Sequence, residues 1–234
     1  MSYKRKDCRF CYSPLELKLK LRPTPIANQF QENPMTGVFY PLDLMECTKC
    51  KHVQTRHVIT DLYKDYKYRT PLANIPKLDE FAKYLKTRYP EAKNVVEIGA
   101  NNGLNIKILH EYFDKVIGVD PDGDAPVWRS AFDMGVAPLI LRQINAKPKT
   151  DGSYWKASGD DPKDKVDIII ANNVLAHIDD LNGVFKAIDH ILANDGVLII
   201  EYQNFLSMTE KGIYDTIYHE HHDQHTAAPW VPFL

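Results

Sequence analysis

The chain contains four cysteines, and they form two C-x-x-C pairs, Cys8 with Cys11 and Cys47 with Cys50. Zinc is commonly held by four deprotonated ligands in a tetrahedron, and a C-x-x-C turn places two sulfurs on one side of it. The second pair completes the tetrahedron. We therefore predict a structural Zn2+ site that supports folding, because four sulfurs leave no open coordination position for chemistry.

Other roles for the cysteine pairs stay open at this point. The thiols could be free of metal, or redox-active, although redox pairs usually occur in a thioredoxin-like βαβ context that this region lacks. Lysines and arginines surround the first pair and could bind nucleic acid. The net charge of -2 gives no overall field that favours such a partner.

A second group of residues surrounds a glycine-containing turn. An apolar strand at 95–99 leads into A-N-N-G and then into a helix. Gly99 and Gly103 allow a ligand to approach the backbone closely. The next expected strand, at 116–120, ends in Asp120, about 20 residues after the turn, where doubly wound folds place a carboxylate that binds ribose hydroxyls.

The order E-x-G-x-N-x-G, strand, terminal Asp differs from the dinucleotide pattern G-x-G-x-x-G. It resembles class I methyltransferases, which bind S-adenosylmethionine. The alternative for Asp120 is a helix N-cap or a turn residue before Pro121.

Histidines follow the last two expected strands. His177 comes after the strand at 166–172, at the edge where open α/β sheets bind ligands. After the strand at 197–202, the stretch 218–222 reads Y-H-E-H-H and offers a base, an orienting carboxylate and a phenol donor. It lacks the H-E-x-x-H spacing of zinc proteases. The alternatives are an adventitious metal site, a polar tail and, for His177, a loop residue satisfied by its neighbours.

The elements that position these residues alternate between apolar strands and amphipathic helices from residue 94 onward. Such alternation indicates an α/β fold with a parallel sheet buried on both faces. We expect strands at 95–99, 116–120, 137–141, 166–172 and 197–202, helices at 104–113, 125–134 and 181–192, and a surface loop at 147–165.

Composition limits where such a protein works. No stretch approaches the ~18–20 apolar residues of a membrane span, and the start lacks the apolar segment of a signal peptide. We therefore expect a cytoplasmic protein without a membrane partner. In that reducing compartment cysteines are more often metal ligands than disulfides.

Taken together, the motifs resemble the sugar C-methyltransferase family. They occur in the family's order and cover nearly the whole chain: C-R-F-C at 8–11, P-I-A-N-Q-F at 25–30, C-T-K-C at 47–50, tyrosines 66 and 68, V-V-E-I-G-A-N-N-G at 95–103, A-N-N-V-L-A-H at 171–177 and D-T-I-Y-H-E-H at 215–221. Members of this family methylate a carbon of thymidine-diphosphate-linked 4-keto-6-deoxysugars, with S-adenosylmethionine as the methyl donor.

The resemblance implies a role for each matched residue. The cofactor would be held by Glu97, Gly99, Asn101, Gly103, Asp120 and Asn172. The nucleotide-linked sugar would be surrounded by His177, Tyr218, Glu220, His221 and, from the zinc domain, Tyr68 or Tyr66. His221, oriented by Glu220, would remove a proton next to the ketone, and Tyr218 and His177 would donate to the enolate oxygen. The enolate carbon would then attack the methyl group.

The expected organisation is a class I methyltransferase with a Rossmann-like parallel sheet, preceded by a small zinc-binding domain. We predict a zinc-binding domain at 1–70, a linker and helix at 71–92 and the methyltransferase domain at 93–234. Two readings compete with sugar methylation: a methyltransferase of the same ancestry for another small acceptor, and a non-catalytic zinc protein that still binds S-adenosylmethionine.

Three features depart from the family pattern. Asn102 stands where the family usually has Asp, and the loop at 147–165 is longer than the family's turn. Family members also continue beyond Y-H-E-H into the rest of the sheet and a further domain. We therefore expect a methyltransferase domain that is truncated at its C-terminal end, and a second chain that completes its sheet is one expected partner.

Overall fold

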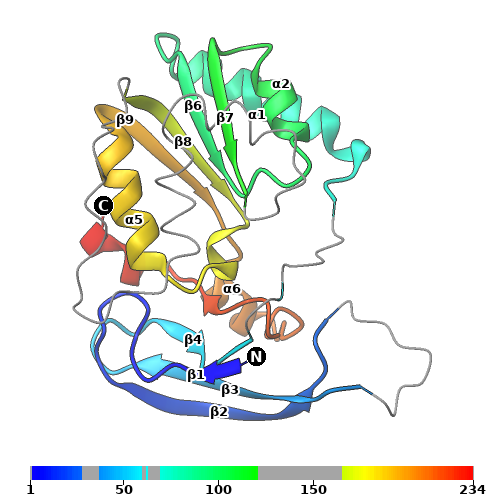
Figure 1. The fold of residues 1–234 in the computed structure, drawn as a ribbon, viewed down its shortest axis with the longest axis vertical. Helices are drawn as coiled ribbons and strands as arrows, with labels where there is room; N and C mark the ends of the chain where they lie inside the picture. The colour runs from blue at the N-terminus through cyan, green and yellow to red at the C-terminus, as the bar shows by residue number, and fades with distance from the viewer. Residues whose placement is uncertain (1, 28–36, 60–61, 63–68, 121–164, 234) are drawn as a thin grey trace. The chain divides into compact units, whose positions relative to one another are not determined.

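The computed structural model describes residues 2–27, 37–59, 62, 69–120 and 165–233 (Figure 1). The chain divides into two compact units, and each is described by itself. The first unit comprises Met1–Leu62, Leu175–Asn182 and Tyr202–Leu234; the second comprises Tyr63–Val174 and Gly183–Glu201. Among the described helices, none combines the length and apolar character needed to span a membrane.

The second unit contains a parallel sheet with the strand order β7-β6-β8-β9. Its strands are β6 (Asn94–Ile98), β7 (Lys115–Val119), β8 (Val166–Asn172) and β9 (Leu192–Glu201). β8 has the predicted bounds, and the other three strands overlap their predicted ranges. The prediction of a parallel α/β sheet is thus confirmed. The expected strand at 137–141, the expected helix at 125–134 and residues 147–164 of the expected loop lie outside the described residues.

Three α-helices are described in or at the border of this unit, α1 (Ile75–Arg88), α2 (Leu104–Leu109) and α5 (Leu181–Ile191), with a short 3-10 turn, η2 (Leu72–Asn74). α1 falls inside the predicted linker and helix. It has a proline in its first turn and basic residues in its last turn, both favourable positions. α2 is shorter than the predicted 104–113, because beyond Leu109 the N–H groups of Glu111 and Tyr112 bond the carbonyls three residues back, as in a 3-10 turn.

Both faces of the sheet are covered. Ile168 and Ile170 of β8 pack with buried residues of α1 and α2 in one core, together with Val95 of β6. The fully buried Ile169 between them points to the opposite face, where Figure 1 shows α5. Alternate strand residues therefore supply two apolar layers, and each fully buried side chain of this size contributes about 1.5–3 kcal/mol.

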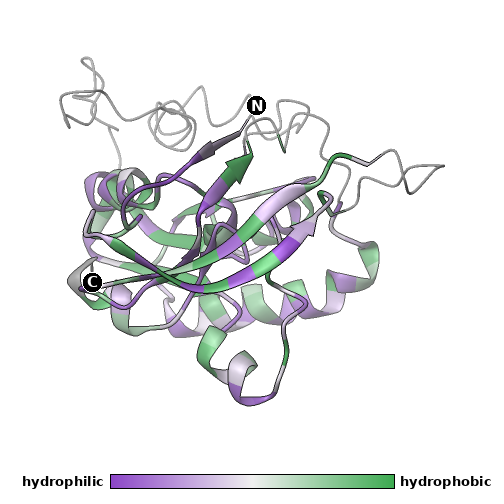
Figure 2. Ribbon diagram, turned by 90° about the horizontal axis from the view of Figure 1, so that it is seen from below, coloured by the Kyte–Doolittle hydropathy of each residue, from purple (hydrophilic) through white to green (hydrophobic). Residues whose placement is uncertain are grey.

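The first unit contains antiparallel strands. β1 (Ser2–Lys4) pairs with β5 (His57–Ile59), and a four-stranded sheet has the order β10-β4-β3-β2. The strands of this sheet are β2 (Leu15–Thr24), β3 (Tyr40–Cys47), β4 (Val53–Thr55) and β10 (Asp223–Gln224). Hydrophilic and hydrophobic residues alternate along β2 and β3, as Figure 2 shows. Leu42 and Leu44 of β3 form a core with Ile217, and Leu21 of β2 packs against it, whereas Leu17 and Leu19 of β2 are exposed.

The first unit also contains the segment that follows β9. This segment has α6 (Phe205–Glu210), β10 and the 3-10 turn η4 (Ala228–Phe233), and residues 175–182 add the turn η3 (Leu175–His177). β10 joins the cysteine-bearing region because Asp223 pairs with Gln54 and Gln224 with Val53. The domain boundaries at 70 and 92 remain a prediction. No sequence pattern predicted that residues 202–234 join the unit that contains the cysteines.

Candidate functional site

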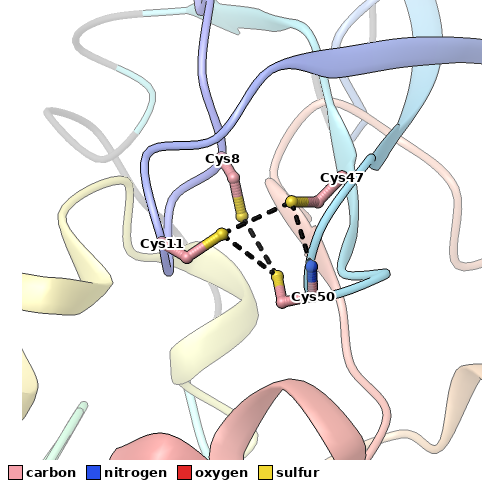
Figure 3. A group of neighbouring side chains, drawn as sticks. All are labelled: Cys8, Cys11, Cys47 and Cys50. Carbon is pink, nitrogen blue, oxygen red and sulfur yellow. Dashed lines mark hydrogen bonds between the residues drawn. The ribbon is translucent and has the colours of Figure 1, made fainter.

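The four cysteines converge on one point (Figure 3). Their sulfurs all lie within 4.8 Å of one another, and the Cys11 sulfur is 3.4 Å from Cys47 and 3.5 Å from Cys50. Cys8 lies 3.6 Å from Cys50. Four sulfurs around a zinc ion at 2.3 Å would be roughly 3.8 Å apart. The donor set and its shape therefore fit a tetrahedral structural zinc site.

The backbone around these cysteines favours thiolates. The N–H of Phe10 lies 3.4 Å from the Cys8 sulfur, and the N–H of Lys49, at the same position in the second pair, lies 3.4 Å from the Cys47 sulfur. Such donors stabilise negative charge on sulfur, and thiolate is the form that binds a metal. Both C-x-x-C pairs thus form the same type of knuckle.

In the second unit, the predicted cofactor residues gather at one edge of the sheet. Asn101 and Asp120 follow β6 and β7, and Asn172 ends β8. Because these strands are parallel, their carboxyl ends share an edge. The backbone N–H of Asn101 donates to Oδ2 of Asp120 at 2.8 Å, which ties the two loops together.

Both glycines of this loop have positive φ angles, which glycine adopts more readily than other residues. Gly99 has φ +77°, and a Cβ built there would lie 2.5 Å from the Val174 side chain. Gly103 has φ 73° at the residue before α2. Gly99 is therefore required because the Val174 side chain lies where a Cβ would be. Contact of Gly99 and Gly103 with a cofactor stays a prediction.

Thr70 is a loop partner that sequence reasoning missed. Oδ1 of Asn101 accepts hydrogen bonds from the N–H groups of Thr70 at 3.1 Å and of Asn102 at 2.8 Å. The Asn102 side chain donates to the Thr70 carbonyl at 3.0 Å, and its oxygen accepts from Leu104 N at 3.3 Å. An aspartate could not make the donated bond, so the departure from the family pattern at Asn102 has a local structural reason.

Glu97 lies beneath the loop, on the face of β6 that packs on α2. Its Oε1 accepts a hydrogen bond from the Asn105 side chain at 2.7 Å, and Oε2 is a buried oxygen without a partner among the described atoms. Burial raises the pKa of Glu97 to about 7, against the lowering effect of Asn105. The described contact of Glu97 is thus with α2, and a contact with cofactor remains a prediction.

In the first unit, Tyr218 and His221 form a hydrogen-bonded pair. His221 Nδ1 lies 3.0 Å from the Thr216 carbonyl, so this nitrogen carries the hydrogen and donates it. Nε2 is then the acceptor, and the Tyr218 hydroxyl lies 2.9 Å from it. The His177 ring lies 4.7 Å from the His221 ring at 76°. This arrangement presents an unprotonated imidazole nitrogen beside a phenol.

The orienting partner of His221 differs from the prediction. Sequence reasoning gave this role to Glu220, but both ring nitrogens of His221 are occupied by Thr216 and Tyr218. The Glu220 backbone accepts a hydrogen bond from His177 instead. A backbone carbonyl such as that of Thr216 leaves no trace in the sequence. Tyr68, predicted to join this group, lies outside the described residues, as does Tyr66.

Burial controls protonation in this cluster. Desolvation, and then the neighbouring His221, lowers the pKa of His177 to about 3. Burial also lowers the pKa of His221 and raises that of Glu220. At neutral pH both imidazoles are therefore neutral, and a neutral imidazole is the form that accepts a proton.

Comparisons with known proteins agree with the two-part organisation. A family model described as a methyltransferase domain matches residues 66–230, and a second model, for a domain described as zinc binding, matches residues 8–61. The chain is 25% identical over 229 residues to the C-methyltransferase NovU of Streptomyces niveus. The alignment covers 92% of this chain and 51% of NovU, so the chain spans about half the length of that relative.

Solved structures with distant similarity include DesVI of Streptomyces venezuelae, with 12% identity, a TM-score of 0.36 and coverage of 60% of this chain and 61% of DesVI. The sugar N-methyltransferase KedS8 from Streptoalloteichus has 17% identity, a TM-score of 0.36 and coverage of 62% and 58%. These scores are too low to support an inference about this chain. The family model is sufficient, since it matches most of the sequence: the chain belongs to the methyltransferase domain family.

Proposed function

We propose that this chain is an S-adenosylmethionine-dependent C-methyltransferase that acts on a nucleotide-linked keto-deoxysugar. The observation that carries the proposal is the hydrogen-bonded pair of Tyr218 and His221, in which the imidazole is neutral and fixed in one tautomer. The similarity to a C-methyltransferase supports it. C-methylation next to a ketone needs a base of this kind, because the carbon must first lose a proton.

The edge residues of the second unit would hold the cofactor. Asp120 stands where a carboxylate binds ribose hydroxyls in doubly wound folds. The backbone N–H of Asn101 orients this carboxylate by a hydrogen bond to its Oδ2 at 2.8 Å. Asn172 reaches the same edge from β8. When bound, S-adenosylmethionine supplies an electrophilic methyl group on a sulfonium.

The side chains of the first unit would generate the nucleophile. Nε2 of His221 would take the proton from the carbon next to the ketone, and the electron pair of the broken C–H bond would form the enolate. Tyr218 donates to Nε2 in the structure, so its hydroxyl would turn to the ketone oxygen as substrate binds. Positioned donors at a developing oxyanion are the largest contribution to many such reactions. The N–H of His177 donates to the Glu220 backbone in the structure, so His177 would have to give up this bond to act as a second donor to the enolate.

Proton exchange at the sugar carbon tests this function without methyl transfer. We would incubate the protein with a thymidine-diphosphate-linked 4-keto-6-deoxysugar in D2O, and follow deuterium at the carbon next to the ketone by mass spectrometry. His221→Ala should abolish the exchange. His110→Ala is the matched control, because His110 is exposed at the end of α2 in the other unit.

Binding measurements separate this proposal from its competitors. Calorimetric titration with S-adenosylhomocysteine and with thymidine diphosphate should show binding of both. Binding of S-adenosylhomocysteine alone would favour a non-catalytic protein or another acceptor. Methyl transfer to a different small molecule, with no exchange at the sugar, would identify the other-acceptor methyltransferase.

Two sequence predictions remain part of the proposal, the cytoplasmic location and a second chain that completes the sheet. The partly exposed strand β9 supports the prediction of a second chain. Its apolar run from Val197 to Ile200 is only half-buried, whereas the neighbouring β8 residues Ile168 and Ile170 are fully buried. Sedimentation analysis that found only monomers would remove the second-chain proposal.

A further inference from the structure

Arg9, the residue between the cysteines of the first knuckle, is fully buried. Its backbone N–H donates to the Gln54 side chain at 2.9 Å. Its guanidinium Nε donates to Asp179 at 2.9 Å. Burial of a guanidinium is costly unless its charge is paired; the charge of Arg9 is paired with Asp179 and its Nε and Nη1 are hydrogen-bonded, while Nη2 has no partner among the described atoms. The side chain of Arg9 therefore has a specific place in the first unit, unlike an ordinary surface arginine.

The guanidinium of Arg9 reaches the segment that carries the proposed catalytic pair. Nη1 donates to the carbonyl of His222 at 3.2 Å, across 213 residues of sequence, and to the carbonyl of Thr55 at 3.0 Å. His222 directly follows His221. The same carbonyl also accepts the backbone N–H of Thr55 at 2.8 Å. Hydrogen bonds from a charged donor are about twice as strong as neutral ones.

A second contact links the two regions beside the first. His52, two residues after the last cysteine, lies 2.6 Å from Oδ1 of Asp223, and both side chains are fully buried. Oδ2 of Asp223 lies 3.8 Å from Nε of Arg9. The His52 ring packs against Phe10 of the first knuckle at 4.5 Å. Arg9 of the first knuckle and His52, just after the second knuckle, thus each place a buried polar side chain against the Asp223 carboxylate.

A further backbone hydrogen bond connects His222 to the residue before His177. The N–H of His222 donates to the carbonyl of Ala176 at 2.7 Å, so the carbonyl and the N–H of one residue are bonded in two directions. His177 follows Ala176, and its ring lies 4.7 Å from that of His221. Displacement of His222 would therefore change the distance between the two histidines.

We propose that Arg9 is a positioning residue through which the tetracysteine centre orders the catalytic segment, residues 216–225. Zn2+ would close the knuckles, and the closed first knuckle would place the guanidinium against the His222 carbonyl. The centre would then act on catalysis through this contact, without touching substrate. The link to catalysis rests on the proposed function, whereas the link between the zinc centre and segment 216–225 stands without it.

Hydrogen exchange of the zinc-loaded protein tests the inference directly. Arg9→Gln keeps a polar side chain but lacks the charge and the fork of donors. We expect it to retain one zinc per chain by metal analysis, and to exchange amides in 216–225 about tenfold faster or more, as loss of a charge-assisted hydrogen bond implies. Arg9→Lys restores the charge alone and should give intermediate protection. Unchanged exchange in zinc-loaded Arg9→Gln would overturn the proposal.

The second knuckle offers a matched control. Lys49 lies between Cys47 and Cys50 as Arg9 lies between the first two cysteines, but it is exposed. Lys49→Gln should leave exchange in 216–225 unchanged; the same acceleration in this variant would assign the effect to the knuckles in general and overturn the role of Arg9. Removal of zinc from the unmodified chain with a chelator should accelerate exchange in 216–225, and full protection after zinc removal would also contradict the proposal.

A second variant covers the case in which Arg9→Gln does not fold. Asp223→Asn keeps the shape of the side chain and removes its charge, so it should loosen 216–225 while zinc stays bound, and unchanged protection would count against the proposal. Binding of S-adenosylhomocysteine should be the same in all variants. If the chain methylates sugars, Arg9→Gln should lower kcat with an unchanged KM for S-adenosylmethionine. Exchange data that fit, without any sugar methylation, would reject the proposed function and leave the zinc link intact.

Discussion

The hydroxyl of Tyr218 lies 2.9 Å from Nε2 of His221, while the carbonyl of Thr216 holds the opposite ring nitrogen at 3.0 Å. Because Nδ1 donates to a fixed carbonyl, the ring cannot turn without loss of that bond. The imidazole therefore presents an unprotonated Nε2 in a fixed direction beside a phenol, which is the arrangement that the proposed base requires.

Replacement of the phenol tests the role of this pair. Tyr218→Phe should lower the rate of proton exchange at the sugar carbon by about 100-fold or more, the usual contribution of a positioned proton donor or acceptor. Tyr214→Phe is the control, because Tyr214 is 62% exposed and lies only four residues earlier in the chain. Equal rates in the two variants would remove Tyr218 from the mechanism.

Acid should destabilise the first unit before its carboxylates titrate. Burial lowers the pKa of His177 to about 3 and that of His222 to about 4, from 6.5. The unfolded chain therefore binds more protons below pH 6.5, and stability present above that pH is lost as the pH falls toward the folded values. At pH 5 each such histidine costs about 2 kcal/mol.

Thermal unfolding at pH 7.5 and pH 5 would measure this loss, with zinc content determined at both values. His177→Gln removes one of the titrating groups and should narrow the difference between the two pH values. An identical difference in this variant and the unmodified chain would show that His177 does not cause the pH dependence.

Glu97 should act in the opposite direction. Its pKa is raised from 4.5 to about 7, so the folded state holds a proton that the unfolded state releases. The stability that this proton supplies is complete below pH 4.5 and is lost as the pH rises through about 7, by about 3 kcal/mol at most. Glu97→Gln should therefore melt at a higher temperature than the unmodified chain at pH 8, and equally at pH 4.5. A lower melting temperature at pH 8 would show that the carboxylate is stabilised by a group outside the described residues.

Asp120 should determine cofactor affinity. Asp120→Ala removes the acceptor of the Asn101 N–H as well as the carboxylate expected at the ribose, and should weaken S-adenosylhomocysteine binding by about 10- to 100-fold. Asp114→Ala is the control, because Asp114 is exposed before β7. Calorimetry gives both affinities, and equal values would place the cofactor elsewhere.

Sequence reasoning succeeded where the signal is local. The apolar run at 166–172 predicts β8 with its observed bounds, because a strand buried on both faces needs a continuous apolar stretch. The two C-x-x-C pairs predict one site because each turn already sets the distance between two sulfurs. Local spacing carries this information without reference to the rest of the fold.

It failed where a backbone atom or a distant segment supplies the partner. The Thr216 carbonyl, which orients His221, and the Thr70 backbone, which holds Asn101, are groups that every residue type has. The burial of Arg9 depends on Asp179 and His222, which are adjacent to it only after folding. Arginine between two cysteines gave no signal of this, because most basic residues near a zinc knuckle are solvated.

The pairing of β10 with β4 also sets an order of events during synthesis. All four cysteines leave the ribosome well before Asp223, whose partner His52 precedes it by 171 residues. Zinc can therefore bind the nascent chain while one edge of β4 is still open, and an open edge is where another chain can pair. The parallel sheet of the second unit is synthesised in this interval. The cysteine-bearing unit therefore begins before the parallel sheet is made and gains β10 only after it, so the open edge of β4 persists while the second unit is synthesised.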